Sequence, residues 1–480
     1  MRTLRLFVIF GALLALALPA TAQTSYVLTI PATVDVQSFA ASHGLTVVRE
    51  IHDGTNCVYV VTSASSDVTG VETEVETDVR VTSFEANAPI SLPETLNGLT
   101  GPVLTQSTAG ILETLPGRTL VTFFGSTVPS NYITQTATTI IRLPDARAAY
   151  PVTGAGIIAI IDTGVDPQHP ALAGVLVPGF DFVHNTSGIP SEFSDAALIN
   201  QSTAGILEQS TAGILEQSTA GILEAQNVVP LNSYTAAILD QSTAGILEGL
   251  VPQDFGHGTM TAGVAHLIAP TAKIMPLKAF TIDGMATASD IIRAIYFAAD
   301  NGANVISMSF SMPANSPSLQ AAIQYALGKN IVVVASSGND GLKTLVYPAS
   351  IGGVHGVGST TNADGRSAFS NYGSGVVLLA APGEGVITTY PGGNYAAGWG
   401  TSFSAPMVAG AASLVLQARP ASKPGDVLNA LSKAKQISDM GYGRIDLYQA
   451  LNSVIGGSSS ISGTSGSNTS GSTSGGSSKP

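Results

Sequence analysis

The feature that most constrains this 480-residue chain is a regular alternation of short apolar runs with longer amphipathic ones. Apolar runs at residues 154–162, 272–280 and 331–335 are separated by helical patterns, such as those at 287–302 and 316–327. Apolar runs joined by helices are typical of parallel strands covered on both faces. We therefore expect an α/β fold with a doubly wound, mostly parallel sheet and helices on both faces. In such folds the functional groups gather at the carboxyl ends of the strands.

The N-terminus has the layout of a secretory signal peptide over residues 1–22. Arg2 and Arg5 precede an apolar run at 6–18, and small residues follow at 20–22. A membrane-spanning helix needs about 20 apolar residues, so this run is too short to serve as an anchor. We predict a secreted, extracellular protein without a transmembrane anchor.

Residue patterning divides the rest of the chain into further parts. Alternating hydrophobic residues between Gly and Asn turns predict a small α+β unit at 23–92, which includes a strand at 79–86. A linker at 93–139 follows, then a main domain at 140–455. Residues 456–480, nearly all Gly, Ser and Thr, indicate a disordered tail without a core.

Charge and cysteine content exclude some classes of function. The formal net charge of −13 argues against nucleic-acid binding, which depends on neutralising phosphates with Lys and Arg. A single cysteine, Cys57, rules out an intrachain disulfide or a Cys-cluster metal site.

The octapeptide QSTAGILE occurs five times, beginning at residues 106, 201, 209, 217 and 241. With degenerate copies in the same frame, residues 193–248 form 56 residues of octads inserted in the main domain. Eight residues advance a helix by about 800°, so the apolar pair would not hold one stripe, whereas a strand keeps each position on one face. A β-rich array is favoured; a poorly ordered loop, a helix, and a duplication without selected function remain alternatives.

Three residues that could take part in catalysis stand at the end of a predicted strand or at the start of a predicted helix. Asp162 ends an apolar run, His257 opens a small-residue helix, and Ser402 begins another. Taken singly, they read as a turn residue, a packed histidine and an N-cap. Together they form the set in which a carboxylate orients an imidazole that takes a proton from a nucleophilic serine. Asn339, after the strand at 331–335, is suited to donate from its amide to an oxyanion, together with the backbone N–H of Ser402.

The segments DTGVD, GHGT and GTSFSAP, in the order Asp, His, Ser, resemble the signatures of the subtilisin-like serine proteases, the subtilases of peptidase family S8. SSGND resembles their oxyanion-hole segment. The resemblance covers about residues 140–451. It implies a subtilisin-like fold, a triad of Asp162, His257 and Ser402, an oxyanion hole of Asn339 and Ser402, and endopeptidase activity through an acyl-enzyme. It also implies that 23–92 is an inhibitory propeptide, an intramolecular partner that is removed autocatalytically.

The resemblance extends to substrate binding and metals. VISMSFSMP, at 305–313, resembles the strand that binds substrate backbone, although Ser311 stands where the family often has Gly. Substrate contacts are expected from six residues: Ser307, Ser309, Phe310, Ser336, Ser337 and Gly338. None is a carboxylate, so we expect protein or peptide substrates cleaved with broad specificity and an apolar bias. The chemistry requires no cofactor, and structural Ca²⁺ is implied by the resemblance alone, since no dense carboxylate run occurs. His169 resembles a structural histidine.

The insertion leaves a second function open. The copy at 106–113 is expected to dock on the array by strand addition and hold the propeptide linker near the groove; alternatively, the array serves self-association or surface binding. A catalytically silent, repeat-bearing binding protein on a protease scaffold is therefore the competing hypothesis. The intact set of Asp162, His257, Ser402 and Asn339 favours the active endopeptidase.

Overall fold

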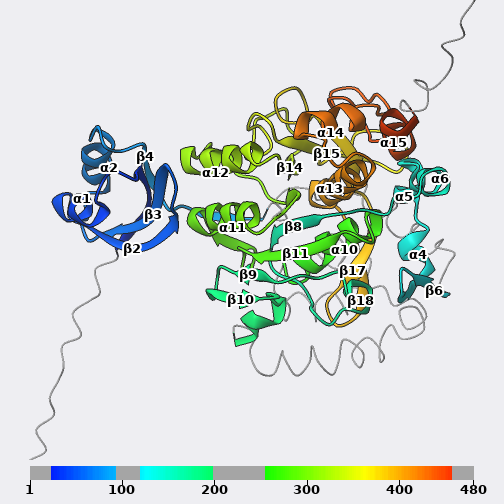
Figure 1. Ribbon diagram of the computed structural model, residues 1–480, viewed down its shortest axis with the longest axis horizontal. Helices are drawn as coiled ribbons and strands as arrows, with labels where there is room; N and C mark the ends of the chain where they lie inside the picture. Colours follow the sequence, from blue (N-terminus) through cyan, green and yellow to red (C-terminus); the bar gives the residue numbers. More distant parts are fainter. Residues whose placement is uncertain (1–22, 93–118, 198–253, 457–480) are drawn as a thin grey trace, which may run out of the picture. The chain divides into compact units, whose positions relative to one another are not determined.

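A computed structural model describes residues 23–92, 119–197 and 254–456, which fall into two compact units divided between Asn87 and Ala88 (Figure 1). The predicted signal peptide, all five octapeptides and the tail from residue 457 lie outside the described residues.

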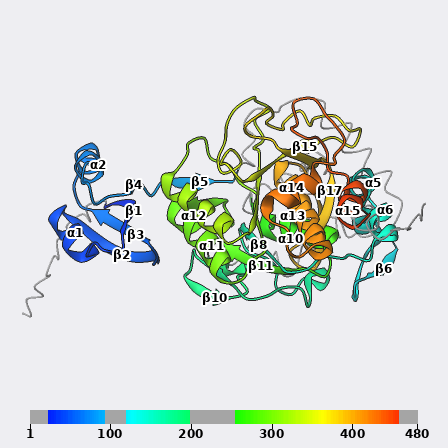
Figure 2. The same cartoon turned by 45° about the horizontal axis from the view of Figure 1, so that its top comes forward.

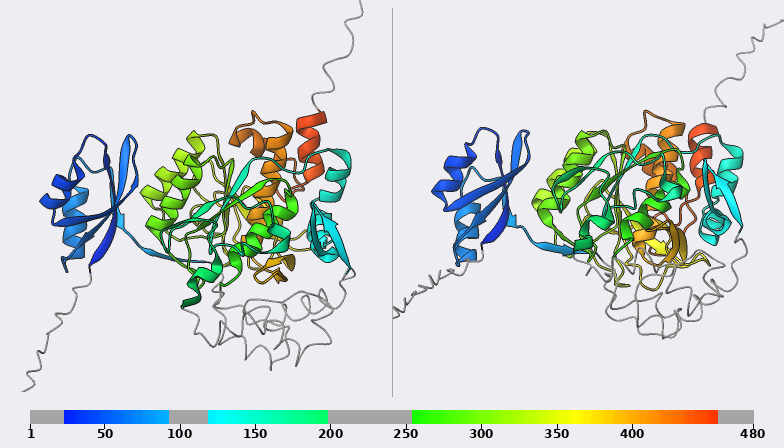
Figure 3. Two further views of the ribbon diagram at one scale, coloured as in Figure 1. Left: turned by 60° about the horizontal axis from the view of Figure 1, so that its bottom comes forward. Right: turned by 90° about the horizontal axis from the view of Figure 1, so that it is seen from below.

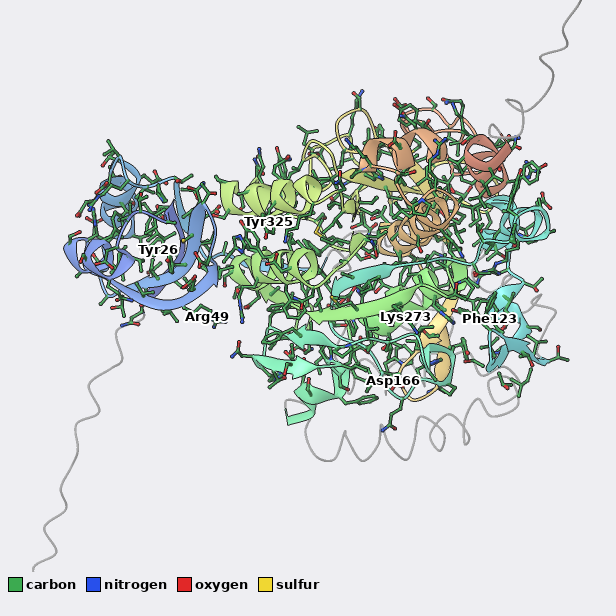
Figure 4. All side chains as sticks on the ribbon, viewed as in Figure 1. Tyr26, Arg49, Phe123, Asp166, Lys273 and Tyr325 are labelled. Carbon is green, nitrogen blue, oxygen red and sulfur yellow. The ribbon has the colours of Figure 1, made fainter. Side chains whose placement is uncertain are left out.

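The N-terminal unit is an antiparallel sheet with two helices. Its strand order is β2-β3-β1-β4. Tyr26, which is labelled in Figure 4, belongs to β1. Its ring stacks on that of Phe84 in β4 with centroids 4.6 Å apart. Asp35 and Asp67 cap the two helices. The predicted strand at 79–86 is shorter than expected, because only its last four residues pair with β1. The elements are β1 (Thr24–Pro31), α1 (Val36–Ser42), β2 (Leu45–His52), β3 (Asn56–Ser63), α2 (Val68–Glu76) and β4 (Ser83–Ala86).

The second unit is built on an eight-stranded sheet of order β10-β9-β11-β8-β13-β14-β15-β16. All neighbours are parallel except β9 and β10, which confirms the expected mostly parallel α/β fold. The central strands are apolar and buried, as strands covered on both faces require. The strands are β8 (Ile157–Asp162), β9 (Gly179–Asp181), β10 (Thr186–Gly188), β11 (Lys273–Lys278), β13 (Val305–Met308), β14 (Val332–Ser336), β15 (His355–Thr360) and β16 (Leu379–Pro382).

Helices cover both faces of this sheet (Figure 2). On one side, α10 (His257–Ile268) packs against α13 (Thr401–Ala418), and both contact the sheet. On the other, α11 (Ala288–Asp300) packs against α12 (Pro317–Gly328). Small residues let α10 and α13 approach closely, since a Cβ added to Gly410 would lie 2.7 Å from Ile268. No helix in the described part of the chain is long and apolar enough to cross a membrane.

Residues 119–139 differ from the expected linker, because they fold as part of the second unit. Tyr132 is fully buried and its hydroxyl donates to the Gly263 carbonyl at 2.7 Å. The same region continues into α6, which lies beside α15 in both views of Figure 3. The elements are β6 (Leu120–Phe123), β7 (Ser126–Pro129), α4 (Ser130–Ile133), α5 (Thr136–Ile140), α6 (Leu143–Ala149), α14 (Pro424–Leu431) and α15 (Leu447–Ile455).

A short strand follows the N-terminal unit and joins the second one. This strand, β5 (Pro89–Ser91), pairs antiparallel with β12 (Met285–Thr287). The compact N-terminal unit thus ends at Asn87, five residues before the expected boundary at 92.

The predicted start of the octad insertion at 193 also differs from the structure. Residues 192–197 form the 3-10 helix η2 (Glu192–Ala197), and Asp195 makes a buried ion pair with Lys278 at 2.9 Å. Asp195 also accepts from the backbone N–H of Ile282, whose carbonyl accepts from the N–H of Asp254. The two described flanks of the insertion therefore meet on Ile282, and residues up to 197 belong to the folded unit.

Candidate active site

Asp162 is the last residue of β8 and is 1% exposed. Its Oδ1 lies 2.7 Å from Nδ1 of His257 and accepts from the backbone N–H of Thr163 at 2.8 Å. Its Oδ2 accepts from the hydroxyl of Thr261 at 3.1 Å. A carboxylate held by three donors keeps one orientation and can fix the tautomer of the imidazole.

His257 is the first residue of α10, and the turn before it needs glycine. Gly256 has φ +94°, and a Cβ there would lie 2.2 Å from the ring of Tyr390. At the next glycine, Gly258, a Cβ would lie 2.0 Å from the carbonyl oxygen of Gly164. These two close approaches set the start of α10 against Tyr390 on one side and against the segment that follows Asp162 on the other.

Ser402 is the second residue of α13 and is fully buried. Its hydroxyl donates to the carbonyl of Ser309 at 3.3 Å, and its own carbonyl accepts from the Ser309 hydroxyl at 2.9 Å. The ring of the next residue, Phe403, packs against the imidazole of His257 with centroids 6.0 Å apart. The structure thus brings the start of α13 beside the Asp162–His257 pair.

Asn339 follows β14 and is 4% exposed. Its Oδ1 accepts from both the backbone N–H and the hydroxyl of Thr401, each at 2.9 Å. Its Nδ2 has no hydrogen-bond partner among the described residues. An anchored amide with a buried donor that makes no bond to the described residues, held at the residue before Ser402, suits the stabilisation of an oxyanion.

The six expected substrate contacts lie in or just after β13 and β14, and all six are buried. Gly338 has φ +88°. The Ser336 hydroxyl donates to the Phe310 carbonyl, and the Ser337 hydroxyl donates to the Asn371 carbonyl. Phe310 also packs on Phe280. The bond between Ser336 and Phe310 connects the two strand ends. The substrate role of the six residues stays a prediction: Ser307, Ser309, Phe310, Ser336, Ser337, Gly338.

Two functional neighbours were missed from the sequence. Thr261 lies one helical turn after His257, and this spacing could have placed it beside Asp162. Glu192 belongs to no motif, yet it is fully buried and bonds to Thr163 and Thr259. Burial raises the pKa of Glu192 to about 7, against the lowering effect of these hydrogen bonds.

The histidines outside the site have structural surroundings. His169 accepts at Nδ1 from Ala171, and its Nε2 lies 2.8 Å from the Asn394 carbonyl. Burial lowers its pKa. Burial, followed by the charge of Arg147, lowers the pKa of His266 to about 4. Neutral, packed imidazoles of this kind agree with the interpretation of His169 as structural.

Structural calcium is implied by the family resemblance alone. Within residues 23–92, 119–197 and 254–456, no three or more His, Cys, Asp or Glu side chains form a group that could hold a metal ion. Calcium is also bound by backbone and amide oxygens, so its binding stays a prediction.

The sequence of this chain is similar to those of known serine proteases. The Subtilase family (Peptidase S8) matches residues 154–451. Thermitase from Thermoactinomyces vulgaris is 33% identical over 326 residues, which cover 65% of this chain and 93% of thermitase. A thermophilic serine proteinase from Bacillus sp. is 33% identical over 299 residues, and this match covers 61% of each chain.

Solved structures agree on the fold. Fervidolysin from Fervidobacterium pennivorans, described as a keratinolytic enzyme related to subtilisin, aligns with a TM-score of 0.61 at 19% identity, over 90% of this chain and 61% of its own. A protease from Pseudoalteromonas arctica aligns with a TM-score of 0.50 at 26% identity, over 65% of this chain and 94% of its own.

Proposed function

Because the chain belongs to the subtilase family of serine peptidases, we propose that it is a secreted endopeptidase with Asp162, His257 and Ser402 as its triad. The observation that carries the proposal is the buried 2.7 Å contact between Asp162 and His257 beside the start of α13. An Asp–His pair next to a serine at a helix N-terminus is the arrangement that activates a weak hydroxyl nucleophile.

The reaction follows from these groups. The Ser402 oxygen attacks the scissile carbonyl carbon while His257 takes the hydroxyl proton, and Asp162 stabilises the resulting imidazolium. The carbonyl oxygen becomes an oxyanion that accepts from Nδ2 of Asn339 and from the Ser402 N–H. The C–N bond then breaks, and His257 returns the proton to the leaving amine. Water, activated by His257, hydrolyses the acyl-enzyme and restores the serine.

The pairing of β5 with β12 supports an apolar substrate bias. Ile90 and Leu92 alternate along this extended segment and are 5% and 1% exposed. The Leu92 N–H donates to the Gly284 carbonyl at 2.9 Å, and Gly284 lies close to the side chain of Asp254, whose carbonyl accepts from the His257 N–H. A substrate added as a strand on β12 in this way would run beside His257 with every second side chain buried.

The same segment supports an inhibitory role for the residues before it. Residues 23–92 are proposed as a propeptide, and residues 88–92 directly follow the compact N-terminal unit. Because 89–91 occupy the edge of β12, an incoming peptide cannot pair there until this segment leaves. Secretion rests on the signal-peptide pattern at 1–22.

Casein hydrolysis by the secreted full chain tests the proposal. Wild type should release peptides and lose residues 23–92 from its own N-terminus, whereas Ser402→Ala should do neither. Ser404→Ala is the matched control: this buried serine lies in the same helix, and its hydroxyl donates to the Ala381 carbonyl. If folded wild type and Ser402→Ala were equally inactive, the silent binding scaffold would be favoured instead.

A further inference from the structure

The start of α10 lacks a local cap. Gly256, its N-cap residue, has no side chain to accept from the first N–H groups of the helix. Instead, the backbone N–H groups of Gly258 and Thr259 donate to Oε1 of Glu192 at 3.0 and 3.2 Å. The Thr259 hydroxyl donates to Oε2 of the same carboxylate at 2.8 Å. A residue 65 positions before His257 therefore holds the helix that begins at this histidine.

The same carboxylate also binds the strand end that bears Asp162. The hydroxyl of Thr163 donates to Oε1 of Glu192 at 2.6 Å and accepts from the N–H of Gly258 at 2.9 Å. Glu192 thus bonds directly to the neighbour of Asp162 and to the first turn of α10. Neither Asp162 nor His257 can shift relative to the other without breaking bonds to this one side chain.

Hydrogen bonds favour a negative charge on Glu192, whereas burial opposes it and raises the pKa of its carboxyl to about 7. Its oxygens accept from four donors: the Thr163 hydroxyl, the Gly258 and Thr259 N–H groups, and the Thr259 hydroxyl. A protonated carboxyl would lose one of these bonds, and the helix N-terminus attracts an anion. The charged or titratable groups that interact with it are Asp162 on β8, Lys278 on β11 and Tyr390 on β17 (Val386–Tyr390).

We propose that Glu192 is a positioning residue for the reaction, which fixes Asp162 and His257 relative to one another through Thr163 and the first turn of α10. This inference rests on the proposed protease function. Glu192 acts through Thr163 and the start of α10 and needs no contact with the substrate. Its removal should therefore lower kcat while leaving KM nearly unchanged, because a misplaced base slows proton transfer without altering the peptide-binding strand.

Three variants of the full chain separate this role from a purely structural one. Glu192→Gln keeps the shape but removes the charge, and Glu192→Asp keeps the charge but shortens the reach. Ser194→Ala is the matched control. The Ser194 hydroxyl lies in the same segment as Glu192 and donates to the Ser191 carbonyl and to the Asp181 carboxylate in β9. Each is assayed with an apolar peptide p-nitroanilide, with rates normalised to the fraction that reacts with a fluorophosphonate.

Expected results differ between the variants. Glu192→Gln should lower kcat by about 10- to 100-fold. Glu192→Asp should also lower kcat, because its shorter side chain reaches Thr163 and the start of α10 less well, and it carries the test if Glu192→Gln does not fold. Ser194→Ala should stay within about twofold of wild type.

Two failures are distinguishable. If wild type does not react with the fluorophosphonate, the protease function itself is wrong and the positioning role falls with it. If wild type reacts but the Glu192 variants match it in kcat, or lose only as much as Ser194→Ala, Glu192 is an ordinary buried residue and the inference alone is overturned.

Discussion

At the scale of single residues, the groups proposed for the chemistry are held by side chains outside their own motifs, as Thr261 and Glu192 show. Asp162, His257 and Ser402 stand in short motifs whose residue types follow from the chemistry. Glu192 could not be predicted, because its role depends on a contact 66 positions away in the chain and no local pattern marks it. Thr261 lies between these cases, since helical spacing from His257 places it but its bond to Asp162 requires the fold.

Asn339 is expected to matter for the rate and little for binding. Asn339→Ala removes the uncommitted Nδ2 donor, so kcat should fall by about 10²- to 10³-fold, the loss that one such donor causes in a subtilisin. Initial rates over a range of peptide concentrations measure kcat and KM separately. Thr401→Val, which removes one bond to the Asn339 oxygen, is the control and should cost far less. An unchanged kcat in Asn339→Ala would exclude this residue from the oxyanion hole.

The buried carboxyl of Glu192 predicts a pH-dependent stability. Its pKa is raised from 4.5 to about 7 when the chain folds. The folded state then holds an extra proton between these values, so this stabilisation is complete below pH 4.5 and is lost as pH rises through 7, by about 3 kcal/mol. Comparing urea unfolding of Ser402→Ala with Ser402→Ala/Glu192→Gln from pH 5 to 8 measures it. The difference between the two should shift in favour of Gln, and parallel curves would contradict the assignment.

At the scale of elements, both helices that bear the proposed nucleophile and base have glycine as the N-cap residue, and side chains from distant parts of the sequence bond to their first turns. Gly256 precedes α10, whose N–H groups bond to Glu192, and Gly400 precedes α13, whose Thr401 bonds to Asn339. The apolar patterns predicted these elements well. The residue pattern could not predict the bonds that Glu192 and Asn339 make to these helices, nor that residues 119–139 fold. Both features depend on tertiary contacts rather than on local helix or strand propensity.

The close packing of α10 on α13 is tested by one methyl group. Gly410→Ala places a Cβ 2.7 Å from Ile268, so it should lower the free energy of unfolding by about 1–3 kcal/mol through overpacking. Thermal unfolding in the Ser402→Ala background measures this without self-digestion. Gly425→Ala in α14 is the matched control, because nothing lies within 4 Å of its added Cβ and its stability should be equal or slightly higher. Equal stability of the two variants would contradict the packing.

At the scale of the whole molecule, the octad insertion interrupts a folded α/β unit. The residues on either side of it, Asp195 and Asp254, both bond to the backbone of Ile282. Repeat counting placed the start of the insertion at 193, because FSDAALIN fits the octad frame. The structure instead keeps Asp195 in the unit, ion-paired with Lys278. A sequence repeat indicates that a segment has been duplicated. The limit of the folded unit depends instead on which side chains are buried and form ion pairs.

Two excisions in the Ser402→Ala background test that boundary. Replacing 198–248 with a short Gly/Ser linker should leave the thermal stability nearly unchanged, because Asp195 and Asp254 both stay bonded to Ile282. Replacing 193–248 also removes Asp195 and leaves the fully buried Lys278 without its carboxylate, which should cost about 3–5 kcal/mol. Equal unfolding temperatures for the two excisions would show that residues 193–197 contribute nothing to the stability of the folded unit.

The central claim, that Ser402 is an activated nucleophile, is tested most directly by mapping a covalent label. Mature wild type and Ser404→Ala are treated with a fluorophosphonate and digested, and the modified residue is identified by mass spectrometry. We expect the label on Ser402 in both proteins and none in Ser402→Ala or in His257→Ala, where the base is missing. A label on another residue, or none on correctly folded wild type, would contradict the account.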